Sequence, residues 1–142
     1  MGMSDAVEIR QVPAQPIAIL RGRTSMAALP QRIRALFNEF YAGFQGKGGL
    51  NIVFYPTFSA TEEFDIECGV QVEDGGNSAT PAGTVATVVH FGPYDRLAQT
   101  HATLHQWARA NGHRLAGPSW ELYGHWSDDP AKLRTDIFYL LS

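Results

Sequence analysis

A single acidic residue, Glu121, stands in an aromatic segment of the chain and could take part in binding or catalysis. The segment, residues 118–126, reads Pro-Ser-Trp-Glu-Leu-Tyr-Gly-His-Trp. Side chains of a β-strand alternate between its two faces, so a strand here would place Glu121, Tyr123 and His125 together. The other face would carry the apolar residues Trp120, Leu122 and Trp126. A carboxylate in an apolar neighbourhood is unfavourable unless a partner compensates it. We therefore predict that Glu121 pairs with a ligand, or else with internal backbone N–H groups or an arginine.

The composition is that of one globular domain, and it excludes several classes of function. The chain has 142 residues, of which 44% are apolar and 18% are charged, a balance unlike that of a disordered chain. Its net charge of −3, with scattered basic residues, argues against direct contact with nucleic acid. No apolar run approaches the roughly 18 residues of a membrane span, and no signal peptide is evident. Cys68 is the only cysteine. We expect it to be a buried, inert thiol in a cytoplasmic, reducing location.

Hydrophobic periodicity predicts the same order of elements twice: strand, helix, strand, strand. In the first half we expect a strand interrupted by a proline-containing bend, then a helix and two strands, at residues 7–20, 29–43, 50–58 and 64–72. In the second half the corresponding elements are expected at residues 84–91, 94–108, 118–126 and 133–141. Apolar and polar residues alternate over 64–72, which is typical of an antiparallel sheet with one solvated face.

The repeated order of elements indicates an internal duplication within one domain of residues 1–142. Leu29 and Leu97, at the start of the two helical patterns, lie 68 positions apart. A glycine-rich loop separates halves of about 5–74 and 79–142. Related halves meet at a pseudo-twofold axis, and the cleft there is a natural place for a binding site.

Four segments of the chain resemble a known family: residues 88–94, the helix containing Trp107, residues 117–123 and residues 135–137. Together they resemble the GyrI-like small-molecule-binding domain, which is the effector-binding domain of bacterial multidrug-responsive transcription regulators and also occurs as a stand-alone protein. The resemblance implies an α+β fold of two pseudo-twofold-related strand–helix–strand–strand units, which form an antiparallel sheet with a central ligand cleft. Because the sequence shows no helix-turn-helix segment, a stand-alone member is expected rather than a complete transcription factor.

The resemblance also implies what such a cleft binds, namely bulky hydrophobic compounds that are often cationic and aromatic. The pocket carboxylate of the family matches Glu121, and its aromatic partner matches Tyr123. We add four further aromatic residues to the expected ligand-binding set: Tyr94, Phe91, Tyr55 and Tyr139. A delocalised cation over such a ring gains roughly 0.5–2 kcal/mol per good contact. Hydrophobic or cationic small molecules are therefore the expected partners.

Other functions remain open on the same cleft. A few stand-alone relatives resemble hydrolases of reactive genotoxic compounds; Glu121 would then be a base or nucleophile, and Tyr123 would orient or donate a proton. Gyrase-inhibitory relatives imply a protein-binding module instead. His101 and His105 lie four residues apart on a predicted helix, but no third ligand is evident, so we expect satisfied or exposed histidines, no metal site and no cofactor. The sequence leaves homodimer formation open.

Overall fold

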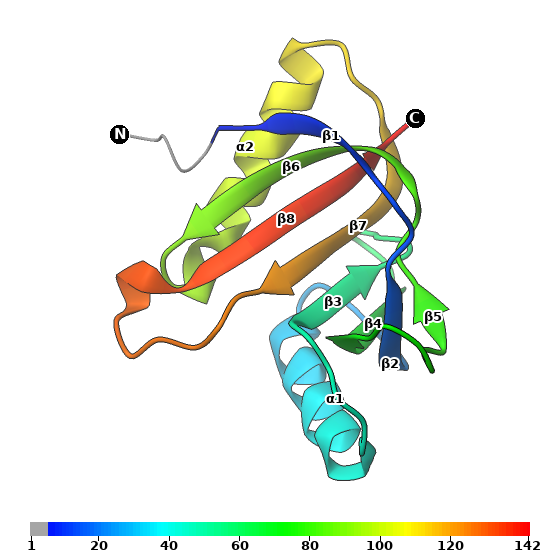
Figure 1. Ribbon diagram of the computed structural model, residues 1–142. Helices are drawn as coiled ribbons and strands as arrows, with labels where there is room; N and C mark the ends of the chain where they lie inside the picture. The colour runs from blue at the N-terminus through cyan, green and yellow to red at the C-terminus, as the bar shows by residue number, and fades with distance from the viewer. Residues whose placement is uncertain (1–5) are drawn as a thin grey trace.

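The computed structural model describes residues 6–142, which form one eight-stranded antiparallel sheet and two α-helices (Figure 1). The strands are β1 (Glu8–Val12), β2 (Pro16–Thr24), β3 (Asn51–Tyr55), β4 (Phe64–Gln71), β5 (Ser78–Ala79), β6 (Gly83–Phe91), β7 (Leu115–Tyr123) and β8 (Arg134–Leu141). The helices are α1 (Leu29–Gly43) and α2 (Leu97–Ala110), with short 3-10 turns η2 (Tyr94–Arg96) and η3 (Pro130–Lys132). The predicted α+β class is confirmed. Residues 1–5 lie outside the described residues. The predictions that the domain begins at residue 1 and that this segment is no signal sequence therefore concern residues that the structure does not describe.

The strand order, β1-β6-β8-β7-β3-β4-β2-β5, reflects two related halves. In chain order, β6, β7 and β8 of the second half correspond to β2, β3 and β4 of the first half. The two sets run in opposite directions across the sheet, so that β7 and β3 are neighbours in its middle. There Val53 pairs with Glu121, and these residues lie 68 positions apart. The same offset relates Leu29 and Leu97, which begin the two helices. The helices and the middle strands therefore follow one internal repeat, and Glu121 lies at the junction of its halves.

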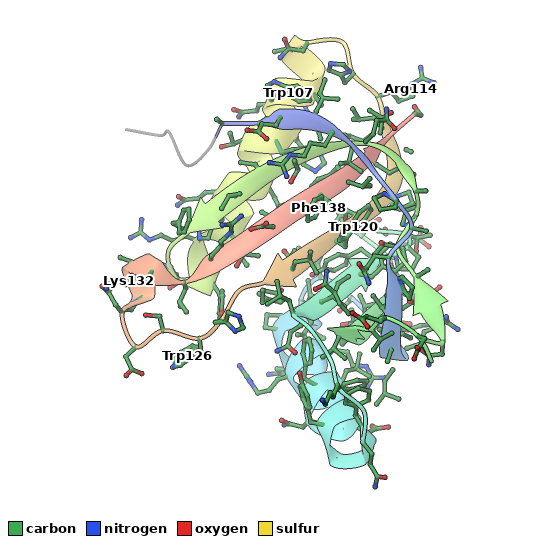
Figure 2. All side chains as sticks on the ribbon, viewed as in Figure 1. Trp107, Arg114, Trp120, Trp126, Lys132 and Phe138 are labelled. Atoms are coloured by element: carbon green, nitrogen blue, oxygen red, sulfur yellow. The ribbon has the colours of Figure 1, made fainter. Side chains whose placement is uncertain are left out.

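The register defines one face of the sheet that carries an aromatic core. Trp120 pairs with Phe54 on β3 and with Phe138 on β8. The Trp120 ring lies 6.1 Å from that of Phe54 and 5.3 Å from that of Phe138, between centroids, and Figure 2 shows Trp120 and Phe138 beside each other. Ile19 of β2 and Val85 of β6 belong to the same cluster, which contains no helix residue. Because β2 and β6 lie near opposite ends of the strand order, the sheet curls around this core.

The opposite face of the sheet carries both helices. The neighbouring residues in the same three strands, Val53, Glu121 and Ile137, pair across β3, β7 and β8 and face this side. Leu36 of α1 packs in one buried cluster with Val53, and Leu104 of α2 packs in another with Ile137. Each helix thus covers one half of the sheet, and the middle strand β7 runs between them. Among the described residues, neither helix has the length and apolar character that a membrane crossing requires.

The prediction of a single interrupted strand over residues 7–20 is wrong. Strand β1 pairs with β6, whereas β2 pairs with β4, so the two segments lie in opposite halves of the sheet. Pro13 lies between the two strands and Pro16 begins β2, and the absence of an N–H group at both positions disfavours a continuous ladder. The first strand of the chain, β1, therefore pairs with a strand of the second half of the sheet.

The prediction of a half-solvated strand at residues 64–72 is also wrong for the middle of β4, which is buried on both faces. Glu67 was expected on the solvated face, yet it is only 4% exposed. The Arg21 guanidinium lies 3.1 Å from its carboxylate, and the Ser78 hydroxyl donates a hydrogen bond of 2.6 Å to it. Curling of the sheet closes this face, and the two partners satisfy the carboxylate that the curl buries.

Candidate functional site

A cleft of about 1110 Å³ lies between the two helices, over the middle of the sheet. Helix α1 contributes Ile33 and Phe37 to its lining, and helix α2 contributes His101 and His105. His101 follows Ile33 by 68 positions, and His105 follows Phe37 by the same offset. Equivalent positions of the two helices therefore line one cleft, with apolar side chains on α1 and imidazoles on α2.

Five of the six predicted binding residues line this cleft: Tyr55, Tyr94, Glu121, Tyr123 and Tyr139. The sixth, Phe91, does not. Its ring is 50% exposed at the end of β6 and lies 5.8 Å from the Arg134 guanidinium, beside a separate hollow of about 240 Å³. Strand alternation explains this placement, because the preceding residue, His90, is buried against Thr100 of α2 at 2.7 Å and turns Phe91 to the other face.

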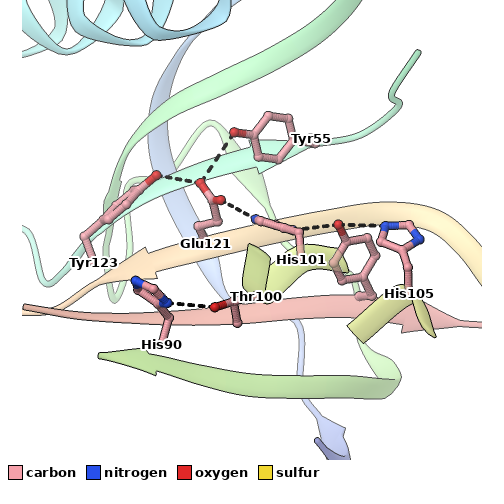
Figure 3. A network of polar contacts seen from close by, with 8 residues as sticks. Tyr55, His90, Thr100, His101, His105, Glu121 and Tyr123 are labelled. Atoms are coloured by element: carbon pink, nitrogen blue, oxygen red, sulfur yellow. Dashed lines mark hydrogen bonds and ion pairs between the residues drawn. The ribbon is translucent and has the colours of Figure 1, made fainter. Parts of the chain in front are cut away.

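Glu121 is 5% exposed at the floor of the cleft, and three side chains donate hydrogen bonds to it (Figure 3). One carboxylate oxygen, Oε1, accepts from the phenol of Tyr123 at 2.5 Å and from the phenol of Tyr55 at 3.4 Å. The other, Oε2, lies 2.6 Å from Nε2 of His101. Within residues 6–142 no arginine pairs with this carboxylate. The internal partners are therefore two phenols and an imidazole, and not the arginine or backbone groups considered from the sequence.

The hydrogen-bond network continues from His101 to the exposed end of the cleft. Nδ1 of His101 lies 2.7 Å from the phenol oxygen of Tyr139, which lies 3.1 Å from Nε2 of His105. The Tyr139 ring meets both imidazoles edge to face. His105 is exposed, whereas His101 is partly buried. Both histidines have hydrogen-bond partners and His105 is also exposed, in agreement with the expectation of satisfied or exposed histidines. The bond from His101 to Glu121 was not predicted.

Burial and the carboxylate together keep the surrounding phenols protonated. Desolvation raises the pKa of Tyr123 and of Tyr55 well above that of a free phenol, and the negative charge of Glu121 raises both further. The pKa of Tyr139 is raised by the same two causes. Burial lowers the pKa of His105, with smaller contributions from His101 and Arg109. The phenols therefore act as neutral hydrogen-bond donors at physiological pH.

Two other candidate chemistries find no support at this site. Cys68 is fully buried on the helix-covered face, where burial and the nearby Glu121 raise its thiol pKa to about 12. A thiol of this kind is a poor nucleophile at neutral pH, which agrees with the inert role expected for it. Within the described part of the chain, no group of three or more histidine, cysteine or acidic residues could hold a metal ion.

The mouth of the cleft carries exposed aromatic and apolar residues. Tyr94 meets the Tyr123 ring edge to face at 5.5 Å, while Met26 and Phe58 come from segments on the α1 side. Trp126 is 73% exposed and also lines the cleft. It was expected on the same strand face as Trp120, but β7 ends at Tyr123, so Trp126 lies in the following loop. Exposed large apolar side chains grouped at a cavity are typical of a binding surface.

The family profile of the GyrI-like small molecule binding domain matches residues 5–141, nearly the whole chain. The chain belongs to this family. No curated protein sequence matches the chain. The matched range includes residues of both halves of the sheet.

Solved structures share the fold at low sequence identity. The C-terminal domain of EcmrR is 22% identical, with a TM-score of 0.74 and coverage of 96% of this chain and 97% of that one. SAV2435 bound to tetraphenylphosphonium is 11% identical, with a TM-score of 0.68 and coverage of 96% and 94%. A hydrolase from Listeria innocua is 13% identical, with a TM-score of 0.61 and coverage of 96% and 91%. At such identities the likeness establishes the fold alone.

Proposed function

We propose that the cleft binds bulky, hydrophobic, aromatic cations, and that Glu121 is the carboxylate that holds them. Membership of the GyrI-like family supports small-molecule binding in general. The observation that carries the finer proposal is the kind of partner that Glu121 has. Two protonated phenols and an imidazole donate to it, and no guanidinium neutralises it among the described residues.

The hydrogen bonds solvate the carboxylate while leaving its charge available. A phenol is a neutral donor, so it lowers the cost of burying the carboxylate without cancelling the negative charge. A cation that enters the cleft then meets this charge in a region of reduced dielectric, where Coulomb attraction is stronger than in water. The bond to Tyr123, at 2.5 Å, also fixes the carboxylate in position.

The remainder of the cleft favours large apolar ligands of varied shape. Its volume of about 1110 Å³ slightly exceeds the usual range for small-molecule sites, roughly 300–1,000 Å³. Ile33 and Phe37 provide an apolar wall on α1, and Tyr94 and Trp126 provide ring faces and edges at the mouth. Such walls contribute dispersion and cation–π attraction without strict directional demands. The tetraphenylphosphonium bound by SAV2435 has this combination of size, aromatic surface and positive charge.

A matched pair of ligands tests the proposal. Tetraphenylphosphonium and triphenylphosphine oxide both carry phenyl groups on phosphorus, but only the first is cationic. Isothermal titration calorimetry at neutral pH should give a dissociation constant at least about tenfold lower for the cation, equivalent to about 1.4 kcal/mol. Equal affinity for the two compounds, or no binding of the cation, would contradict the proposal.

A second candidate function, hydrolysis of reactive electrophiles, is favoured by the short contact between Tyr123 and Glu121. A carboxylate 2.5 Å from a phenol could act as base or nucleophile while the phenol donates a proton to the leaving oxygen. The Listeria innocua hydrolase has the same fold. Incubation with a strained epoxide such as styrene oxide distinguishes the two functions. Diol formation that is lost in Glu121→Gln would favour the enzyme, and unchanged epoxide would favour binding alone.

A further inference from the structure

His101 stands between the pocket carboxylate and a path to solvent, and its two ring nitrogens have different partners. Nε2 lies 2.6 Å from Glu121, and Nδ1 lies 2.7 Å from the Tyr139 phenol oxygen. Tyr139 in turn lies 3.1 Å from Nε2 of His105, which is exposed. The result is a continuous chain of hydrogen bonds from Glu121 through His101 and Tyr139 to His105.

This chain of hydrogen bonds can be satisfied with either of two proton arrangements. With His101 neutral, its Nε2–H donates to Glu121, the Tyr139 hydroxyl donates to Nδ1 of His101, and Nε2–H of His105 donates to Tyr139. With His101 protonated on both nitrogens, it donates to Glu121 and to Tyr139, and the Tyr139 hydroxyl donates to His105. No heavy atom moves between the two arrangements, because a phenol can donate in one direction and accept in the other.

The two arrangements differ in the charge that a ligand meets. Neutral His101 leaves Glu121 as a net negative charge, whereas doubly protonated His101 forms an ion pair with it. A cationic ligand and the second proton on His101 therefore compete for the same carboxylate. A neutral ligand gains nothing from either arrangement through this charge.

We propose that His101 is a specificity-determining residue of the cleft, which gives up its second proton when a cationic ligand binds, so that affinity for cations rises with pH while affinity for neutral ligands does not. This inference rests on the proposed function. Histidine is suited to the role because its charge changes between about pH 5 and pH 8. By linkage, a ligand that displaces one proton gains up to about tenfold in affinity per pH unit over the range in which that proton is bound.

The network also supplies the route by which the proton leaves. The proton on Nδ1 of His101 passes to the Tyr139 oxygen while the Tyr139 hydroxyl proton passes to Nε2 of His105. His105 then loses its Nδ1 proton to water, and the neutral arrangement remains. Burial and neighbouring positive charge lower the pKa of His105, which favours this last step.

Other charged and titratable groups face the cleft around His101. They come from α1, β3, η2, α2, β7 and β8, and comprise Arg34, Tyr55, Tyr94, Asp95, His105, Glu121, Tyr123 and Tyr139. The pKa values of the three buried phenols are raised, so these phenols do not titrate below pH 8. Arg34 and Asp95 are exposed to solvent. Among the charged and titratable groups at the cleft, His101 alone lies within hydrogen-bond distance of both Glu121 and Tyr139.

The two histidines of the hydrogen-bond network lie on the α2 side of the cleft only. The positions equivalent to His101 and His105 in α1 are occupied by Ile33 and Phe37, which also line the cleft. The charged part of a ligand should therefore bind beside α2, while Ile33 and Phe37 of α1 contact the apolar part of the ligand. Replacement of His101 by glutamine keeps an N–H donor toward Glu121 and removes the titration.

Calorimetry over about pH 5.5 to 8 tests the inference with tetraphenylphosphonium and triphenylphosphine oxide. Wild-type protein should bind the cation up to about tenfold more tightly per pH unit at the acidic end, and should release up to about one proton, measured by comparing buffers of different ionisation enthalpy. In His101→Gln the cation affinity should vary less than about threefold over this range and the released proton should be lost. The matched control is His113→Gln, because His113 stacks on Trp107 and does not line the cleft.

The possible outcomes separate this inference from the function on which it rests. Tight binding of the cation with no proton release, or with the same pH dependence in wild type and His101→Gln, would overturn the role of His101 and leave the proposed function intact. Absence of cation binding at every pH would overturn both. If His101→Gln does not fold, His101→Asn takes its place, because asparagine also removes the titratable ring, and the same two outcomes apply.

Discussion

Tyr55 and Tyr123 occupy equivalent positions in the two repeats of this domain, 68 residues apart, and their phenols meet at one oxygen atom of Glu121. The central pairing of β3 with β7 explains the convergence, because it places Val53 opposite Glu121 and sets each tyrosine two residues further along its own strand. Glu121 has no acidic counterpart in the first repeat. The repeat therefore places two equivalent tyrosines around a carboxylate that only one half supplies.

The two phenols should contribute unequally to stability despite their equivalence. The Tyr123 bond is 2.5 Å long and the Tyr55 bond 3.4 Å, and short bonds to a charged acceptor are the stronger ones. Tyr123→Phe should lower the free energy of unfolding by about 1.5–3 kcal/mol, and Tyr55→Phe by about 1 kcal/mol or less. Urea denaturation of both variants measures this. Equal losses, or a larger loss for Tyr55→Phe, would contradict the stronger hydrogen bond assigned to Tyr123.

Trp126 should report ligand binding through its fluorescence. It is 73% exposed at the cleft, whereas Trp120 is buried in the core, and Trp107 on α2 is partly buried against the cluster that contains Ile137 of β8. Addition of tetraphenylphosphonium should change tryptophan emission in the wild type, and Trp126→Phe should remove most of that change. Because the side chain is exposed, the replacement should alter unfolding free energy by less than about 0.5 kcal/mol. An undiminished emission change in Trp126→Phe would place the ligand elsewhere.

Cys68 should resist thiol reagents in the folded protein. Its thiol pKa is raised to about 12, so at pH 8 the folded protein holds far less thiolate than the unfolded chain. The reaction with a disulfide reagent should then be roughly 10³-fold slower in native than in urea-unfolded protein, and should accelerate as pH rises toward 12. Absorbance of the released thiol measures both rates. Rapid labelling of native protein at pH 8 would contradict the burial of Cys68.

Gly69 should tolerate no side chain, because strands β2 and β4 approach closely there. A Cβ atom at this position would lie 1.8 Å from the carbonyl oxygen of Ala18. Gly69→Ala should therefore lower the free energy of unfolding by more than about 3 kcal/mol or prevent folding. Gly43→Ala is the matched control, since a Cβ there meets nothing within 4 Å at the end of α1. Similar thermal stability of the two variants would contradict the pairing of β2 with β4.

Local patterns predict the helices and most strands, because their apolar spacing is read within a few residues. The helical stripe from Leu29 onward matches α1, and the alternation after Phe64 matches β4. Burial of Glu67 was not predictable in this way, because it results from the curl of the whole sheet. The separation of β1 from β2 has the same origin, since partners are chosen by strands far away in the chain.

Strand alternation predicted part of the lining of the cleft. Glu121 and Tyr123 share a face of β7, and both line the cleft as expected. Phe91 was misplaced because the face of β6 that meets α2 is fixed by the contact of His90 with Thr100 on that helix, which strand alternation alone does not reveal. The pairing of His101 with Glu121 joins a helix to a strand, and spacing along the helix alone does not identify it. The displacement of 68 residues, already visible in Leu29 and Leu97, was the available signal for aligning His101 with the cleft.

The central claim is that the charge of Glu121 holds cationic ligands in the cleft, and the affinity of Glu121→Gln for tetraphenylphosphonium and for triphenylphosphine oxide tests it most directly. Glutamine keeps the shape of the side chain and removes the charge, and Glu39→Gln on the exposed face of α1 is the matched control. Calorimetry should show that Glu121→Gln raises the dissociation constant of the cation by at least about tenfold and that of the neutral oxide by less than about threefold. Both dissociation constants should be unchanged in Glu39→Gln. Equal weakening of the two ligands in Glu121→Gln would contradict the account.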